Sequence, residues 1–225
     1  MEFYEFSLLC FACIGYLIGS IPFGLLLCQI FGHGDIRLIG SGNIGATNVL
    51  RTGNRILAFA TLILDSGKGA FSVLATYAVI DFLGPAIIDG HCEGDCDTLV
   101  HQTKKTCAYV AGLAAITGHC FPIWLKFKGG KGVATTLGTL LVAAPIAGFI
   151  ACATWLISAF IGRISSLAAL SAMIMAPFAV YYFYGTLESL LTLCISLLVV
   201  IKHHENIKRI LKGEEPKIGK KKDIT

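Results

Sequence analysis

Apolar residues run along this chain in stretches that are too long for strands and long enough to cross a bilayer. The first covers about 3–31, and a spanning helix needs only about 20 residues. Further stretches lie at about 66–83, 107–124, 133–141, 146–161, 167–184 and 187–201. The pattern predicts an all-α, polytopic membrane helical bundle of about seven transmembrane segments, with a kink near Pro22 in the first.

One apolar region, 54–85, is interrupted by the polar run Asp65-Ser-Gly-Lys68-Gly. Ionisable side chains at membrane depth are costly and usually functional. We expect 54–64 to lie shallow or re-entrant, with Asp65 and Lys68 near the cytoplasmic interface, where they can pair with each other. A single kinked helix over the whole region is the alternative that the sequence leaves open.

Charge predicts the orientation of the bundle. Glu2 and Glu5 precede the first span, whereas arginines follow it, so we expect the N-terminus outside and the C-terminus in the cytoplasm. Alternation then makes 86–106 an acidic extracytoplasmic loop and 203–225 a cytoplasmic basic tail that is attracted to anionic lipid headgroups. The N-terminus lacks a basic region, so we expect no cleavable signal peptide.

Composition supports a membrane protein. The 225 residues are 55% hydrophobic and 14% charged, against about 25% charged in soluble domains. This length predicts one integral membrane domain over 1–225. Six of the nine cysteines lie in apolar runs and are expected to be buried. The predicted loop brings Cys92, Cys96 and Cys107 near His91 and His101. A plain surface loop is the first expectation here; of the two alternatives, a disulfide is favoured over a zinc site, whose usual spacing is absent.

A small, polar and glycine-rich stretch between two spans runs from Gly40 to Arg51 and reads Gly-Ser-Gly-Asn-Ile-Gly-Ala-Thr-Asn-Val-Leu-Arg. Its glycines allow tight turns, and its hydroxyl and amide side chains offer neutral donors. The residues from Ala46 on are predicted to begin a helix, whose free N–H groups attract phosphate. The stretch predicts a phosphate cradle at the membrane surface; a connecting loop that binds nothing would need no such array of donors.

The same stretch contains the pattern G-x-G-x-x-G, and Asp65 lies at about the spacing of a ribose-binding acid. A dinucleotide site needs a strand before the glycines and a crossover helix after them. The apolar run before this loop is far too long for a strand, which argues against nucleotide binding.

Two further clusters suit chemistry on an anion. In Lys128-Gly-Gly-Lys131-Gly, the glycines let backbone and ammonium groups converge, although the P-loop spacing is absent. His203 and Asn206 lie at i and i+3, on one face of a predicted helix. Histidine titrates near neutral pH and suits acid–base work. No Ser-His-Asp arrangement and no H-x-x-x-x-D motif is present, which argues against acyltransferases that use a His–Asp base.

Together these motifs resemble those of the bacterial acyl-phosphate-dependent glycerol-3-phosphate acyltransferases of the PlsY type. The resemblance covers nearly the whole chain, and only the loop at about 87–107 is longer and richer in cysteine than is usual in the family. The matching residues are Ser41-Gly42-Asn43 through Asn48 and Arg51; Asp65-x-x-Lys68-Gly69; Gly118-His119 with Pro122; Gly129-Gly130-Lys131-Gly132-Val133-Ala134-Thr135; and His203-x-x-Asn206-Ile207 with Gly213-x-Glu215.

The resemblance implies a multi-pass enzyme of the bacterial inner membrane whose active site faces the cytoplasm. It would transfer a fatty acyl group from acyl phosphate to the 1-hydroxyl of glycerol 3-phosphate, giving lysophosphatidic acid and phosphate, the first acylation in phospholipid synthesis. No metal, other cofactor or nucleic acid is implied. The implied partners are the two substrates, the lipid bilayer and a peripheral acyl-phosphate synthase in contact with the enzyme.

Each motif then receives a role. Residues 40–47 would hold the acyl phosphate, with Thr47 and backbone N–H groups stabilising the oxyanion. The expected catalytic residues are Ser41, Thr47, Lys131 and His203. The expected substrate-binding residues are Gly40, Gly42, Asn43, Gly45, Ala46, Asn48, Arg51, Ser166 and Asn206. The proton of the attacking hydroxyl goes either to His203 or to a substrate phosphate oxygen; we favour the phosphate, because His203 has no evident carboxylate partner.

A transporter for phosphate or an organic phosphate is the rival hypothesis, because it would share anion sites and broken helices. The anion clusters all fall on one predicted side of the membrane, and no inverted repeat is evident. Both features favour the enzyme.

Overall fold

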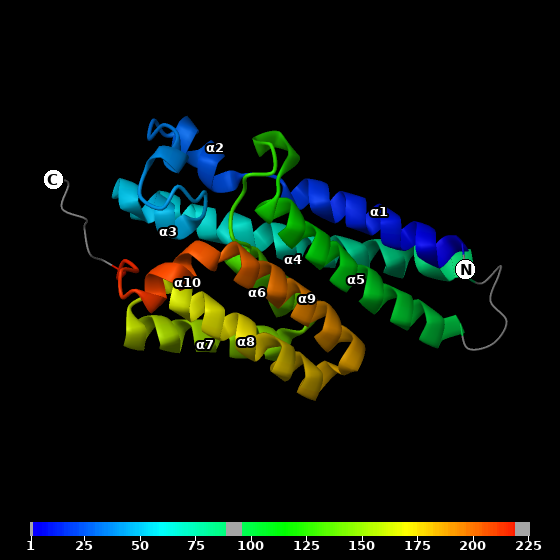
Figure 1. Ribbon diagram of the computed structural model, residues 1–225. Coiled ribbons are helices and arrows are strands. Elements are labelled where there is room, and N and C mark those ends of the chain that lie inside the picture. The colour runs from blue at the N-terminus through cyan, green and yellow to red at the C-terminus, as the bar shows by residue number, and fades with distance from the viewer. Residues whose placement is uncertain (1, 89–95, 219–225) are drawn as a thin grey trace.

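The computed structural model describes residues 2–88 and 96–218, and these form a helical bundle (Figure 1). Its α-helices are α1 (Glu2–Gly19), α2 (Phe23–Ile30), α3 (Ala46–Val49), α4 (Arg55–Ile88), α5 (Cys96–Cys120), α6 (Val133–Ala143), α7 (Pro145–Gly162), α8 (Ser165–Tyr184), α9 (Thr186–Lys202) and α10 (His204–Leu211). Short 3-10 turns η1 (Ile36–Leu38), η2 (Leu50–Thr52) and η3 (Ile123–Leu125) lie in the connections.

All seven predicted apolar segments are helical. Within the described residues, five stretches are long and apolar enough to cross a membrane: α1 with α2, α4, α5, α7 and α8. The pair α9 and α10 would make a sixth, bent by 62° between Lys202 and His204, and α6 is a shorter apolar helix of 11 residues. The predicted kink is a break around Pro22, which separates α1 from α2.

The expected interruption at Asp65 is wrong. Helix α4 runs without a break for 34 residues, so 54–64 is not a separate shallow segment, and the alternative of one helix is correct. The two charges do not break the helix because they satisfy each other inside the bundle, with Lys68 Nζ 2.9 Å from Asp65 Oδ1. At 1.5 Å per residue the helix is roughly 50 Å long, more than a hydrocarbon core is thick.

Residues 86–88 and 96–106 of the predicted loop are helical. Helix α4 continues to Ile88 and α5 already begins at Cys96, because both helices extend beyond their apolar cores. Cys96 is disulfide-bonded, which goes against the plain loop expected first, whereas Cys107 is a free, buried thiol within α5. The predictions for His91 and Cys92 fall outside the described residues.

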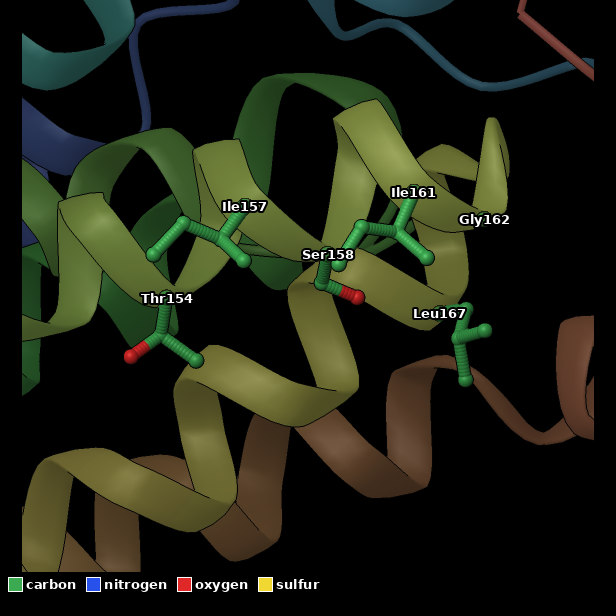
Figure 2. A pocket seen from close by; sticks show the side chains of 6 residues that line it. All are labelled: Thr154, Ile157, Ser158, Ile161, Gly162 and Leu167. Carbon is green, nitrogen blue, oxygen red and sulfur yellow. The ribbon is translucent and has the colours of Figure 1, made fainter.

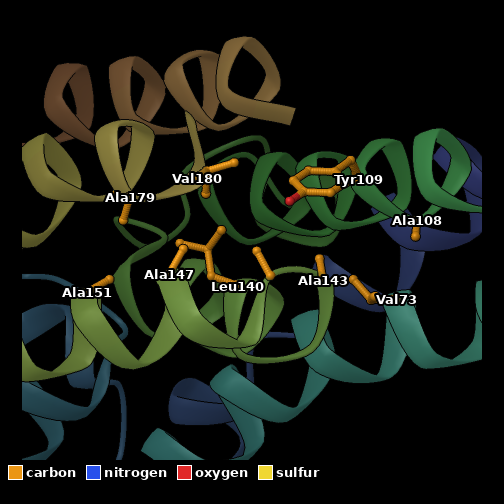
Figure 3. Packing of buried hydrophobic residues seen from close by; sticks show 11 residues of the cluster. Val73, Ala108, Tyr109, Leu140, Ala143, Ala147, Ala151, Ala179 and Val180 are labelled. Atoms are coloured by element: carbon orange, nitrogen blue, oxygen red, sulfur yellow. The ribbon is translucent and has the colours of Figure 1, made fainter. Parts of the chain in front are cut away.

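Small residues let these helices approach closely. A Cβ atom on Gly19 would lie 2.0 Å from the carbonyl oxygen of Ala115, and one on Gly138 would lie 2.0 Å from that of Ser66. Figure 3 shows a core built largely of alanines from α6, α7 and α8 around Leu140 and Tyr109. Interfaces of this kind are typical of membrane helices, which associate through close backbone packing.

The polar loops gather at one end of the bundle. Helices α2, α3 and α10 and the start of α8 lie together there, while the start of α1 lies at the opposite end (Figure 1). This end therefore contains the glycine loop, residues 40–51, and the C-terminal end of the described chain.

We expect Gly138→Ala to destabilise the protein, because the new methyl group would overlap the α4 backbone. Overpacking of this kind costs about 1–3 kcal/mol. Gly67→Ala is the matched control on the facing helix, where a Cβ atom would meet nothing within 4 Å. Thermal unfolding of both variants in detergent measures the difference; equal midpoints would contradict the tight α4–α6 contact.

Candidate functional site

The side chain of Asn48 organises the glycine loop. Its Oδ1 accepts hydrogen bonds from the backbone N–H of Ser41 at 3.0 Å and from the Ser41 hydroxyl at 3.2 Å. Its Nδ2 donates to the carbonyl oxygens of Ile36, Ile39 and Asn43 at 2.8–3.0 Å. With the residue only 1% exposed, these bonds occupy the amide fully. Asn48 therefore shapes the cradle and has no free group to offer a substrate.

A small apolar core holds this loop against the bundle. Ile36, Ile44 and Val49 are buried in a cluster with side chains of α2 and α4. Gly24 of α2 permits the contact, because a Cβ atom there would lie 2.0 Å from the carbonyl oxygen of Ile44. Packing against α2 and α4, together with the hydrogen bonds of Asn48, thus fixes the irregular backbone of the loop.

Arg51 lies over the first turn of the loop. A Cβ atom on Gly40 would lie 2.4 Å from Cδ of Arg51, and the φ of +58° at Gly40 also favours glycine. Gly42 has a φ of +69°, for the same reason. Arg51 is exposed and has no ion pair within residues 2–88 and 96–218. Its guanidinium is therefore available to an anion at the loop.

The loop meets the start of α8 through Thr47. Its hydroxyl lies 3.3 Å from that of Ser165, the first residue of this 20-residue helix. The N-cap residue Ile164 makes no side-chain cap hydrogen bond, so the first turn of α8 presents N–H groups next to Thr47. The other predicted loop residues, Asn43, Gly45 and Ala46, lie at the turn that leads into α3.

A second group of polar side chains surrounds the carboxylate of Glu215. Its Oε1 accepts from the Ser166 hydroxyl at 2.7 Å and from Nδ2 of Asn206 at 2.5 Å. Its Oε2 pairs with Nε of Arg209 at 2.6 Å. Lys131 joins from the loop before α6, because its ammonium donates to Oδ1 of Asn206. Residues from three distant parts of the chain therefore converge on one carboxylate.

Burial and neighbouring charges shift the pKa values of Lys131 and Glu215 in this group. Burial lowers the pKa of Lys131 to about 8, although Glu215 counteracts part of this effect. Burial alone would raise the pKa of Glu215, but hydrogen bonds from Ser166, Asn206 and Arg209 outweigh it and lower that pKa. At neutral pH the lysine is mostly charged and the carboxylate fully so.

His203 lies buried at the bend between α9 and α10. Burial lowers its pKa to about 4, so the ring is neutral at pH 7. Nδ1 lies 2.7 Å from the carbonyl oxygen of Val199, which can only accept, so Nδ1 carries the proton and Nε2 does not. A nitrogen with this pKa is a weak base.

The structure thus arranges the predicted residues in two groups that meet at the start of α8. Ser165 contacts Thr47 of the glycine loop, and its neighbour Ser166 contacts Glu215. Glu215 and Arg209 were absent from the predicted site. The signal for Glu215 was the Gly213-x-Glu215 motif, and Arg209 lies six residues before that glutamate, in α10, but the sequence did not show which side chains they would join.

A groove between α7 and α8 flanks the second group. It has a volume of about 430 Å³, and Figure 2 shows the side chains that line it. They are Thr154, Ile157, Ser158, Ile161, Gly162 and Leu167. Leu167 follows Ser166 directly, so the groove begins beside the polar cluster.

The chain is similar to known proteins over nearly its whole length. A family model described as glycerol-3-phosphate acyltransferase matches residues 9–213. The glycerol-3-phosphate acyltransferase of Jannaschia sp. (strain CCS1) is 49% identical over 211 residues, which cover 93% of this chain and 92% of the relative. That of Caulobacter vibrioides (strain NA1000 / CB15N) is 52% identical over 214 residues, covering 92% and 86%.

Two crystal structures of PlsY, an integral membrane glycerol 3-phosphate acyltransferase, are also similar. The glycerol 3-phosphate form has a TM-score of 0.77 and 31% identity, and the lysophosphatidic acid form has 0.75 and 29%. Each alignment covers 95% of this chain and 96% of the other. On these matches over nearly its whole length, the chain belongs to the glycerol-3-phosphate acyltransferase family of integral membrane proteins represented by PlsY.

Proposed function

We propose that this acyltransferase takes its acyl group from acyl phosphate and transfers it to the 1-hydroxyl of glycerol 3-phosphate. The observation that carries the proposal is the junction at the start of α8, where the glycine loop meets the cluster of Lys131 and Glu215. Both substrates and the leaving group contain phosphate, and this junction offers backbone N–H groups and cations for two of them.

The glycine loop is the proposed site of the acyl phosphate. Its backbone N–H groups other than those of Ser41 and Gly42, together with the hydroxyl of Thr47, hold the phosphate and stabilise the oxyanion that develops on the acyl carbonyl. The Ser41 hydroxyl joins them by turning from Asn48 to the phosphate. Arg51 neutralises the leaving phosphate. Lys131 and Asn206 bind the phosphate of glycerol 3-phosphate, with Ser166 completing the pocket.

The reaction needs no covalent enzyme intermediate, because acyl phosphate is a mixed anhydride with a good leaving group. The 1-hydroxyl oxygen attacks the acyl carbon, the anhydride C–O bond breaks, and phosphate departs. The hydroxyl proton goes to a phosphate oxygen of substrate, since His203 is too weak a base to compete. The protein contributes positioning and charge stabilisation.

The groove between α7 and α8 is the proposed place for the start of the acyl chain. Its isoleucine and leucine side chains suit methylene groups, and Leu167 of its lining directly follows Ser166 in the chain. The apolar tail can then leave the site along the lipid-facing side of the bundle.

The polar end of the bundle is proposed to face the cytoplasm of a bacterial inner membrane. Arg37 and Arg51 lie in the segments next to α3, α10 carries Lys208 and Arg209, and Lys131 contacts Asn206 of α10. Cytoplasmic loops carry such an excess of lysine and arginine. The starts of α1 and α5 would then lie outside.

An acyl-transfer assay tests the donor. Detergent-purified protein receives palmitoyl phosphate and labelled glycerol 3-phosphate, with acyl-CoA as the competing donor and EDTA present. We expect lysophosphatidic acid from acyl phosphate alone. Product from acyl-CoA only would contradict the donor, and glycerol 3-phosphate flux into proteoliposomes without any product would favour the transporter.

The lowered pKa of Lys131 predicts that affinity for glycerol 3-phosphate depends on pH. Its ammonium is charged below about pH 8 and loses the proton as pH rises through that value. At pH 8 the phosphate of glycerol 3-phosphate is already dianionic, because its second pKa is about 6. We expect the KM for glycerol 3-phosphate to rise above pH 8 in the wild type.

In Lys131→Met we expect this KM to be about tenfold higher at pH 7, because a hydrogen bond to a charged group is lost, and to vary little between pH 7 and 9. Lys126→Met, in the same loop but exposed, is the control that should keep the wild-type profile. An unchanged rise of KM with pH in Lys131→Met would assign the titration to another group.

His203→Ala should lose affinity for substrate more than turnover. We expect KM to rise about tenfold and kcat to fall less than about threefold, because the ring shapes the pocket and takes no proton. His204→Ala, which removes an exposed neighbouring ring, serves as the control. A fall in kcat of about a hundredfold or more with unchanged KM would make His203 the general base.

A further inference from the structure

Three ionisable side chains lie together inside the bundle, apart from both groups of the proposed site. Asp65 and Lys68 of α4 are 2% and 4% exposed, and His119, near the end of α5, is 5% exposed. One oxygen of Asp65 lies 2.9 Å from Nζ of Lys68 and 3.6 Å from Nδ1 of His119. Buried charges in membrane proteins are expensive and are retained where they serve a function.

Lys68 connects this cluster to the break in the first span. Its Nζ donates to the carbonyl oxygen of Ile21 at 2.9 Å, just before Pro22. The ammonium also lies 5.7 Å from the centre of the Phe23 ring. The α1–α2 break is therefore held to the middle of α4.

His119 connects the same cluster to the loop that carries Lys131. The N–H groups of Gly130 and Gly129 donate to the carbonyl oxygens of His119 and Cys120, at 2.9 and 3.2 Å. Gly130 also lies directly against the ring, since a Cβ atom there would be 2.0 Å from Nε2 of His119. Gly130 of the loop therefore packs against the Nε2 side of the imidazole, and Asp65 faces the Nδ1 side.

We propose that the cluster of Asp65, Lys68 and His119 positions Lys131 for binding glycerol 3-phosphate. The imidazole sets where Gly130 can lie, and the next residue is Lys131, whose ammonium must reach Asn206. Asp65 faces Nδ1 of that ring at 3.6 Å, and Lys68 fixes the position of the Asp65 carboxylate. Because Gly130 covers His119, the cluster acts through the loop and touches no substrate. The inference rests on the role of Lys131 in the proposed function.

A double-mutant cycle tests the positioning role, because two residues that act through one contact are not additive. Kinetics are measured for the wild type, His119→Gln, Lys131→Ala and the double variant. We expect His119→Gln to raise the KM for glycerol 3-phosphate on the order of tenfold, the scale that misplacement of a binding group can reach. The double variant should have the KM of Lys131→Ala alone, with kcat changed much less.

Asp65→Asn provides a second cycle with Lys131→Ala, because it removes the charge at nearly constant volume. Gly130→Ala provides a third that keeps all three charges and displaces the loop, so the test stands even if one variant does not fold. Gly67→Ala, on the same turn of α4 with open space around it, should keep the wild-type KM.

The outcomes separate this inference from the proposed function. If Lys131→Ala keeps the wild-type KM, Lys131 does not bind glycerol 3-phosphate and both fail. If Lys131→Ala is impaired but folded His119→Gln or Asp65→Asn has a normal KM, or adds its full effect to that of Lys131→Ala, the positioning role alone is overturned.

Discussion

The carboxylate of Glu215 is the constraint on which the polar end of this protein depends. Burying an unpaired carboxylate would cost several kcal/mol, so its partners must come to it. Ser166 comes from α8, Asn206 and Arg209 come from α10, and Lys131 reaches the group through Asn206. The bend after α9 and the loop before α6 are therefore held by the same charge. A change at this one position would loosen three segments together.

Irregular backbone is the second constraint, since a bundle in lipid must satisfy every polar group internally. In the glycine loop, the side chain of Asn48 satisfies backbone groups that have no helical hydrogen-bond partner. Its amide supplies both the donors and the acceptor. At the break around Pro22, Lys68 has this role, because it binds the carbonyl oxygen of Ile21. In both places a polar residue that could be mistaken for a ligand group serves the backbone.

This ambiguity marks how far the sequence could predict the structure. Hydrophobic length predicted the seven helical segments, and the motifs predicted the family, because both signals are local. Polar type alone could not distinguish Asn48, whose amide shapes its own loop, from Asn206, whose amide joins Lys131 to Glu215. Nor could it place Glu215 at the centre of a site or show that Asp65 leaves α4 intact, because the compensating partners are distant in sequence or depend on burial.

The paired charges also bear on how such a site handles phosphate. Lys131 and Arg209 carry two positive charges and Glu215 removes one, which leaves a net charge of +1 on this cluster. Without the carboxylate, the two cations would repel each other, and Arg209 already acts to lower the pKa of Lys131. A cluster of two bare cations would bind substrate and product phosphate alike, and uniform binding does not raise turnover. Partial neutralisation keeps the lysine protonated at neutral pH while limiting how tightly either phosphate is held.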